Sequence, residues 1–347
     1  MPVSWGDVLK ELQQVIASGQ PLPQGMSPFD VLRRLYLTRL HDATKRNVIL
    51  YASKWTQAPS DPDSVSIVPE DLQGFMEVLS ELEPDAGLDL VLHSPGGSGE
   101  AAESIVKYLR AHFTDVRVIV PHAAMSAATM LACSANKILM GTHSFLGPID
   151  PQFIMQQEGG GRIAVAAHAI LAQFALAKQE CADPSLMPAW IPMLRQYGPA
   201  LLVQCQLAQD LSRSLVAEWL EQYMLAGQPD AKAKAEAAAT ALSDHSKFKS
   251  HGRFIDRKQA RAIGLEVDDL ETNPAVENAA LGVFHATTHT FSSTAAVKLL
   301  ENHRGRAFIK IQQIVQFPMQ APPAGPAPAP AQPTPPPAST AQVSVKF

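Results

Sequence analysis

Residues 88–109 read LDLVLHSPGGSGEAAESIVKYL, and residues 116–150 read VRVIVPHAAMSAATMLACSANKILMGTHSFLGPID. These stretches alternate short, almost wholly apolar runs with segments of helical periodicity, which predicts a β-α-β-α-β order. Near-continuous apolar strands joined by helices are typical of a parallel sheet that is covered on both faces and has right-handed crossovers. We therefore predict an α/β layered fold built from parallel β-α-β units.

Two chain reversals in this region have compositions that suit a reactive site. The glycine turn, residues 93–97 (HSPGG), follows a predicted strand, and glycine permits positive φ and a close backbone approach to a ligand. In the serine turn, residues 123–127 (AAMSA), Ser126 lies between a strand and an Ala- and Met-rich helix. Backbone N–H groups at the start of that helix would stabilise a developing oxyanion. Ser126 is therefore a candidate nucleophile, with Gly96, Gly97 and Ala127 as the candidate oxyanion hole, although an ordinary N-cap serine would occupy the same position.

A serine nucleophile needs a general base, and the residues alone leave several candidates open. Lys178 lies in an apolar segment predicted as a helix over residues 164–180, where burial would lower the pKa of its ammonium group. The alternative is a lysine that reaches solvent near the end of its helix. His93, His143 and His168 are rival bases, and Asp150 could orient a base, contact substrate or form a turn. The sequence has no G-x-S-x-G elbow, which disfavours an ordinary α/β-hydrolase.

Motifs for cofactors and metals are missing from the sequence. The segment after the glycine turn lacks the Gly-Lys-Ser/Thr of a phosphate loop, and it contains no G-x-G-x-x-G pattern. His285 and His289 have the spacing of two metal ligands on a helix, but no third ligand is evident. We therefore expect neither a cofactor nor a metal.

The remainder of the chain is predicted to be mostly helical. Ser27 is expected to cap a helix that has Pro28 and Asp30 in its first turn. Further helices are predicted at residues 201–225, 256–263 (stopped by Gly264) and 293–302, with a last strand at residues 307–311. We predict an N-terminal helical segment (residues 1–45), a main domain with a helical C-terminal region (residues 46–316) and a disordered Pro/Ala-rich tail (residues 317–347).

The composition excludes several classes of protein. Hydrophobic residues make up 46% of the chain and charged residues 18%, so a large core can form, and the net charge of −5 argues against a nucleic-acid partner. The sequence contains no run of about 18 apolar residues, so we expect no membrane span. The three cysteines are widely spaced, which indicates a reducing compartment and, with no secretory signal, the cytoplasm.

Several motifs together resemble one protease family. The segments SPGG, AMSAATM, MGTHSFLGPIDPQ, SHGRFIDRKQARAIGL and LLENHRGRAF are similar to those of the SDH-type (serine dehydrogenase proteinase) family. That family has the ClpP/crotonase fold and is related to Clp proteases and signal peptide peptidases. The resemblance implies that Ser126 is the nucleophile and that Gly97 and Ala127 supply the oxyanion hole. Asp150 stands where Clp proteases have histidine. The resemblance therefore favours the Ser-Lys dyad of signal peptide peptidases, with Lys178 as the base.

The implied function is a serine endopeptidase that cleaves a peptide or unfolded protein through an acyl-enzyme intermediate. Relatives assemble into rings, so we expect a homo-oligomer, and the Pro-rich tail could bind a partner. Two alternatives stay open. A crotonase-like acyl-CoA enzyme would use the oxyanion turns without a serine nucleophile, and a non-catalytic ring-forming adaptor would need neither.

Overall fold

The computed structural model describes residues 2–23, 25–57, 61–156, 160–312 and 344–346. Its α-helices are α1 Trp5–Ala17, α2 Pro28–Thr44, α3 Pro62–Val65, α4 Asp71–Leu79, α5 Gly99–His112, α6 Ala127–Cys133, α7 Ala167–Glu180, α8 Met187–Leu194, α9 Leu201–Trp219, α10 Ala231–Ser243, α11 His245–Phe248, α12 Arg257–Ile263 and α13 Pro274–Ser293. Its strands are β1 Asn47–Ser53, β2 Leu88–His93, β3 Val116–Val120, β4 Ala123–Ala124, β5 Lys137–Met140, β6 Phe145–Leu146, β7 Gln152–Gln156, β8 Arg162–Ala166, β9 Val267–Asp269, β10 Ala296–Asn302, β11 Ala307–Ile311 and β12 Ser344–Lys346.

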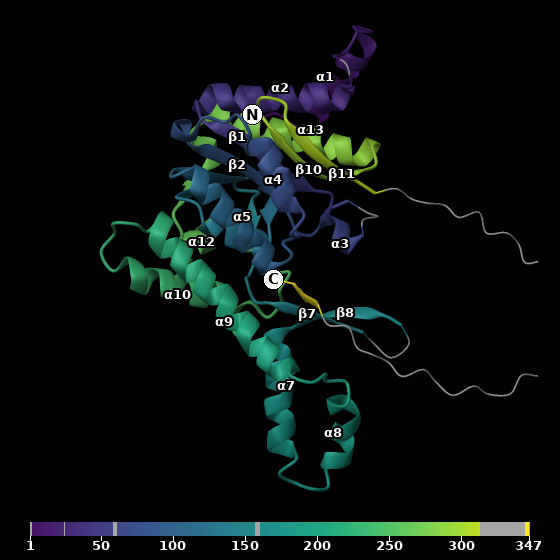
Figure 1. The fold of residues 1–347 in the computed structure, drawn as a ribbon, viewed down its shortest axis with the longest axis vertical. Helices are drawn as coiled ribbons and strands as arrows, with labels where there is room; N and C mark the ends of the chain where they lie inside the picture. The colour runs from purple at the N-terminus through teal and green to yellow at the C-terminus, as the bar shows by residue number, and fades with distance from the viewer. Residues whose placement is uncertain (1, 24, 58–60, 157–159, 313–343, 347) are drawn as a thin grey trace, which may run out of the picture.

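A seven-stranded sheet with the order β11-β10-β1-β2-β3-β5-β9 forms the centre of the molecule (Figure 1). Strands β1, β2, β3, β5 and β9 are parallel. At one edge of the sheet, β10 pairs antiparallel with β1, and β11 pairs antiparallel with β10. Strands β1, β2, β3 and β5 are almost entirely buried, as the apolar runs in the sequence predict. The predicted α/β fold with parallel β-α-β units is confirmed.

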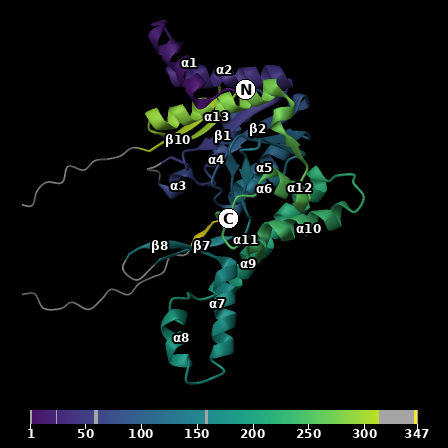
Figure 2. The same cartoon turned by 180° about the vertical axis from the view of Figure 1, so that it is seen from behind.

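Helices cover both faces of the sheet and divide the core into two clusters. Leu90, Leu92 and Val118 belong to the cluster on the face that carries α5 and α6, whereas Val91 and Ile119 belong to the cluster under α2 and α13. Figure 2 shows these two pairs of helices on either side of the strands. This alternation follows from the two-residue period of a strand.

Two end signals predicted for helices are confirmed. The side chains of Ser27 and Asp30 form a capping box at the start of α2, with Pro28 at its first position. Gly264 ends α12 with φ of 109°.

Three elements differ from the sequence predictions. Residues 296–302 form strand β10 rather than a helix, because this short apolar run fits either period and its two charged residues find buried partners on opposite faces of the sheet. Residues 162–166 form strand β8 of a hairpin with β7, so the helix predicted from residue 164 begins at Ala167. The long helix α13 was not predicted.

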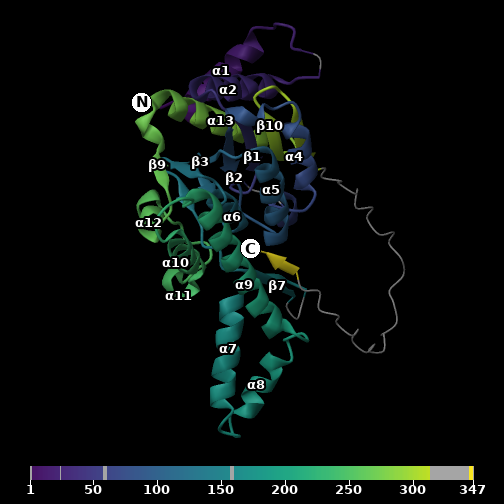
Figure 3. The ribbon, with the colours of Figure 1, turned by 60° about the vertical axis from the view of Figure 1, so that its left-hand side comes forward.

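Helices α7 and α8 form an arm that projects from the body, and α9 leads back from the arm toward the sheet (Figure 3). Helix α8 has no buried residue. Among the described residues, no helix has the length and apolar character that crossing a bilayer requires. The predicted disordered tail lies outside the described residues except for β12, which pairs antiparallel with β7.

Candidate active site

Ser126 occupies a strained junction between β4 and α6. Its backbone has φ of 54° and ψ of −120°, a region that side-chain-bearing residues rarely adopt. The side chain does not cap α6, and its buried hydroxyl has no hydrogen-bond partner among the described residues. Strand-to-helix turns with this kind of strain present nucleophilic serines in other enzymes. The interpretation of Ser126 as an ordinary N-cap is therefore wrong.

A network of hydrogen bonds holds the serine turn in this conformation. Ser94 N–H donates to Ala123 O (3.2 Å), and Met125 N–H donates to Ser94 O (2.9 Å), so the glycine and serine turns are joined. Thr129 Oγ1 donates to Ala124 O (2.8 Å) and accepts from Gly147 N–H (2.9 Å). Because these groups pair with one another, they fix the Ser126 backbone from both sides.

The glycine turn lies directly against Ser126. A Cβ atom added to Gly96, which has φ of 92°, would lie 2.7 Å from Ser126 Cβ and 2.8 Å from Ala127 N. A Cβ added to Gly97 would lie 2.3 Å from Ile67 O. Neither Gly97 N–H nor Ala127 N–H donates a hydrogen bond to a residue in the described part of the chain. Two unbonded donors thus lie on the two turns that meet at the serine.

Asp150 binds two histidines that the sequence analysis did not single out. Its carboxylate is buried and lies 2.8 Å from His245 Nδ1 and 2.9 Å from His251 Nδ1. The carboxylate accepts a hydrogen bond from each Nδ1–H, which leaves Nε2 of a neutral ring with its lone pair. A histidine held in this way by a carboxylate has the tautomer of a general base.

The other predicted bases lie elsewhere. Lys178 is exposed on the last turn of α7 and has no partner among the described residues, so it is not buried as we expected. His143 is exposed on the loop before β6 and does not contact Asp150. His168, on α7, has its ring 5.5 Å from that of His245.

His93, the last residue of β2 and the first of the glycine turn, is buried and is not oriented as a base. Its Nδ1 donates to Ala123 O (3.2 Å), and its ring packs against Trp55, His122 and Phe284. Burial, with a smaller contribution from His122, lowers the pKa of His93 to about 3. The ring is therefore neutral at physiological pH and supports the turn as a packed, uncharged group.

The signals that could have revealed the new residues are uneven. His251 belongs to SHGRFIDRKQARAIGL, a segment that carries the family resemblance, but the resemblance did not assign it a role. Nothing local distinguishes His245. Of the suggested metal pair, His289 Nε2 lies 3.1 Å from Trp5 O instead, and no group of metal-ligating side chains is assembled among the described residues.

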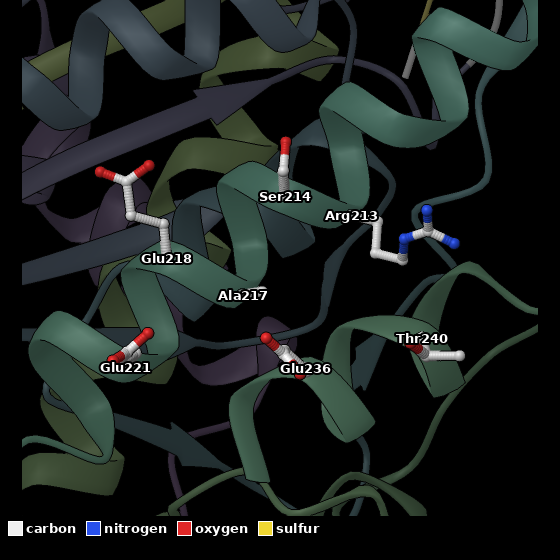
Figure 4. Close-up of a pocket in the computed structure, with 7 residues that line it drawn as sticks. All are labelled: Arg213, Ser214, Ala217, Glu218, Glu221, Glu236 and Thr240. Carbon is white, nitrogen blue, oxygen red and sulfur yellow. The ribbon is translucent and has the colours of Figure 1, made fainter. Parts of the chain in front are cut away.

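Another hollow in the surface is formed by helices that carry none of these residues. A pocket of about 450 Å³ between α9 and α10 is lined by Arg213, Ser214, Ala217, Glu218, Glu221, Glu236 and Thr240 (Figure 4). None of these side chains belongs to the two turns or to the Asp150 cluster. Its position therefore gives no support to a role in the same chemistry.

Comparison with known proteins supports the assignment of these turns to a protease class. The family model for ClpP-like SDH-type serine proteinases matches residues 67–184. This match confirms the resemblance for the part of the chain that contains both turns, Asp150 and Lys178. His245 and His251 lie beyond the matched residues.

Individual relatives are similar over shorter or more distant alignments. The uncharacterized protein MJ0137 of Methanocaldococcus jannaschii is 45% identical over 83 residues, which are 24% of this chain and 29% of that protein. The uncharacterized protein MJ1495 of the same organism is 36% identical over 83 residues, 24% of this chain and 28% of that protein. The chain thus spans less than a third of the length of these curated relatives. A solved structure of the 1510-N membrane-bound stomatin-specific protease, in a mutant form, is 16% identical over 58% of this chain and 74% of that chain, with a TM-score of 0.33.

Proposed function

We propose that this chain is a serine endopeptidase in which Ser126 is the nucleophile. The observation that carries the proposal is the strained serine turn packed against the glycine turn, with an unpaired hydroxyl beside two unbonded backbone donors. Backbone strain of this type costs roughly 1–3 kcal/mol and persists where the surrounding structure imposes it, often as part of a catalytic mechanism. The family match over residues 67–184 supports the same reaction class.

For the general base, we favour an imidazole bound to Asp150, either His245 or His251. Both rings have a buried carboxylate on Nδ1, and an Nε2 that can accept the serine proton. Lys178 stays the alternative predicted from the sequence. Lys178 is exposed on α7, and Ser126 Oγ has no hydrogen-bond partner among the described residues. Another copy of the chain or a movement of the arm would therefore have to bring a Lys178 to Ser126.

The reaction follows from these roles. The base takes the Oγ proton as Ser126 Oγ bonds to the peptide carbonyl carbon, and the N–H groups of Gly97 and Ala127 stabilise the resulting oxyanion. The C–N bond then breaks, and the leaving amine takes the proton from the base. Water then gives a proton to the same base as its oxygen bonds to the acyl carbon. The C–Oγ bond breaks, and Ser126 Oγ takes that proton from the base, which releases the acid and regenerates the serine.

We also propose that the protein acts as a homo-oligomer on a peptide or unfolded protein in the cytoplasm, with the Pro-rich tail available to a partner. The arm supports assembly, because exposed apolar side chains on a protein surface often mark a contact with another chain. Its exposed apolar residues are Phe174, Leu176, Met187 and Ile191. Three free cysteines support a reducing compartment. Light scattering coupled to gel filtration tests the assembly, and a monomer at micromolar concentration would contradict it.

Covalent labelling tests the nucleophile. We expect a fluorophosphonate probe to modify the wild-type protein at Ser126 and to leave the Ser126→Ala variant unmodified. The rate of casein hydrolysis should fall by roughly 10³-fold or more in that variant, since Ser126 Oγ is the proposed attacking atom. An unlabelled wild-type protein would refute the proposal, leaving the acyl-CoA enzyme and the adaptor as the alternatives.

A further inference from the structure

A buried ion pair lies behind the glycine turn. Lys298 on β10 and Asp71 at the start of α4 both have no exposed surface. Lys298 Nζ lies 2.7 Å from Asp71 Oδ1 and 2.8 Å from Oδ2, and it donates a further hydrogen bond to Ser66 O (2.6 Å). The hydroxyl of buried Tyr51 donates to Asp71 Oδ2 (2.6 Å).

This network holds both ends of the Ser66–Val68 segment. At one end, Ser66 O accepts from Lys298, and at the other, Val68 N–H donates to Asp71 Oδ2 (2.9 Å). Ile67, between them, is left with its backbone groups directed to the glycine turn. Ile67 N–H donates to Gly96 O (2.8 Å), and Ile67 O accepts from Ser98 N–H (2.9 Å).

These contacts fix the orientation of the proposed oxyanion donor. The two hydrogen bonds of Ile67 flank Gly97, so the N–H of Gly97 itself points away from Ile67, as alternate peptide groups of an extended chain do. The backbones of Gly97 and Ile67 are in close contact, because a Cβ added to Gly97 would lie 2.3 Å from Ile67 O and 2.4 Å from Ile67 N. A shift of Ile67 would therefore shift Gly97.

Stability alone is a weak reason for such a pair. Removing two charges from water opposes folding, and replacing a buried ion pair with apolar groups of similar volume is often neutral or stabilising. An ion pair does provide directional bonds to specified backbone atoms, which apolar packing cannot provide. We propose that Tyr51, Asp71 and Lys298 are positioning residues, which set the direction of the Gly97 N–H through Ser66–Val68. This inference rests on the proposed peptidase activity.

The same strand provides a matched control. Glu301, three residues after Lys298, forms an ion pair with Arg33, and both side chains are fully buried. That pair lies on the opposite face of β10, under α2, and its further hydrogen bonds go to Asp30, Arg34 and Thr290. Disrupting it should therefore affect the fold to a similar degree without reaching the glycine turn.

The experiment compares two double variants in which both charges of a fully buried pair are removed together, so that neither member of the pair is left as a lone buried charge. In Asp71→Asn/Lys298→Met, we expect kcat for p-nitrophenyl butyrate and the rate of fluorophosphonate labelling to fall by about 10-fold to 100-fold, with KM unchanged. In Arg33→Met/Glu301→Gln, we expect wild-type rates at a comparable Tm. The milder Tyr51→Phe variant should lower kcat a few-fold and gives the answer if the first double variant does not fold.

The outcomes separate the two proposals. Equal rates in the two double variants at matched Tm, or a wild-type kcat in Tyr51→Phe if the first double variant does not fold, would overturn the positioning role. A loss that appears only in KM would do the same. If the wild-type protein is not labelled, or is labelled equally in Ser126→Ala, the peptidase proposal itself fails.

Discussion

The serine turn and the arm differ in how completely the chain surrounds them. Around Ser126, every residue of α6 is buried and the turn is tied to β6, Thr129 and the glycine turn by hydrogen bonds. On the arm, α8 has no buried residue and Lys178 is exposed. A single copy of the chain can therefore preorganise the proposed nucleophile and the proposed oxyanion donors, whereas a contribution of the arm to that site would depend on contacts outside this copy.

The contrast extends to two lysines. Prediction of a base from sequence relied on the burial of Lys178, which is exposed in the structure. Lys298, by contrast, is fully buried, and burial is the main cause that lowers its pKa. Lys298 is bonded to Asp71 and Ser66, so it is not available to take a proton from Ser126. A perturbed lysine in this protein marks structural support rather than a general base.

The largest expected change in kcat comes from substitutions that test whether the general base is an Asp150-bound histidine or Lys178 on the arm. We expect Asp150→Asn to lower kcat by roughly 10³- to 10⁴-fold, because the amide would favour the wrong imidazole tautomer. Lys178→Ala should leave kcat within a few-fold of wild type. Casein hydrolysis by both variants, together with His245→Ala and His251→Ala, measures this. The reverse pattern would return the base to the arm.

A smaller effect is expected from adding one methyl group to each region. Gly97→Ala should lower kcat by roughly 10²- to 10³-fold, because the new Cβ collides with Ile67 and displaces a donor of the oxyanion hole. Gly198, between α8 and α9, has no atom within 4 Å of an added Cβ and provides the control. Gly198→Ala should have wild-type kcat and Tm. Full activity in Gly97→Ala would show that the turn tolerates movement.

The pH dependence of stability should reflect His93, the buried histidine at the start of the glycine turn. The pKa of His93 is about 3 in the folded protein and about 6.5 in an unfolded chain, so only the unfolded chain gains a proton between these values. The contribution is complete above pH 6.5, and it falls by up to about 1.4 kcal/mol per pH unit as the pH drops toward 3.

Urea unfolding at several pH values would show this dependence. His93→Gln should reduce the slope, whereas His112→Gln, at an exposed position, should not. An unchanged slope in His93→Gln would mean that the His93 ring is more accessible to water than its burial indicates.

The smallest effect on activity is expected from probing the cysteines. Burial raises the pKa of Cys133 on α6 to about 12, whereas Cys181 at the end of the arm is only partly buried. Under native conditions, Ellman's reagent should modify Cys181 first, without loss of kcat, and Cys133 only as the core opens. Rapid modification of Cys133 would indicate that the region around α6 is less rigid than its packing suggests.

Sequence reasoning was most effective for features of the candidate site that depend on neighbouring residues. The paired glycines after β2 and the serine between β4 and α6 are local signals, and the structure brings them together as one parallel sheet requires. The partners of Asp150 come from residues about 100 positions later, and no local pattern specifies that meeting. Strand β10 was mistaken for a helix for a related reason, because distant partners decide the burial of Lys298 and Glu301.

The pairing of β12 with β7 has a consequence for the Pro-rich segment. Residues 312–343 connect β11, at the edge of the main sheet, to a three-residue strand on β7. A three-residue strand gains little free energy from pairing. The fraction of molecules in which β12 is paired with β7 therefore depends on the effective concentration that the connecting residues impose. Lengthening or shortening that connection would change the fraction of molecules in which β12 covers β7, without altering any residue of either strand.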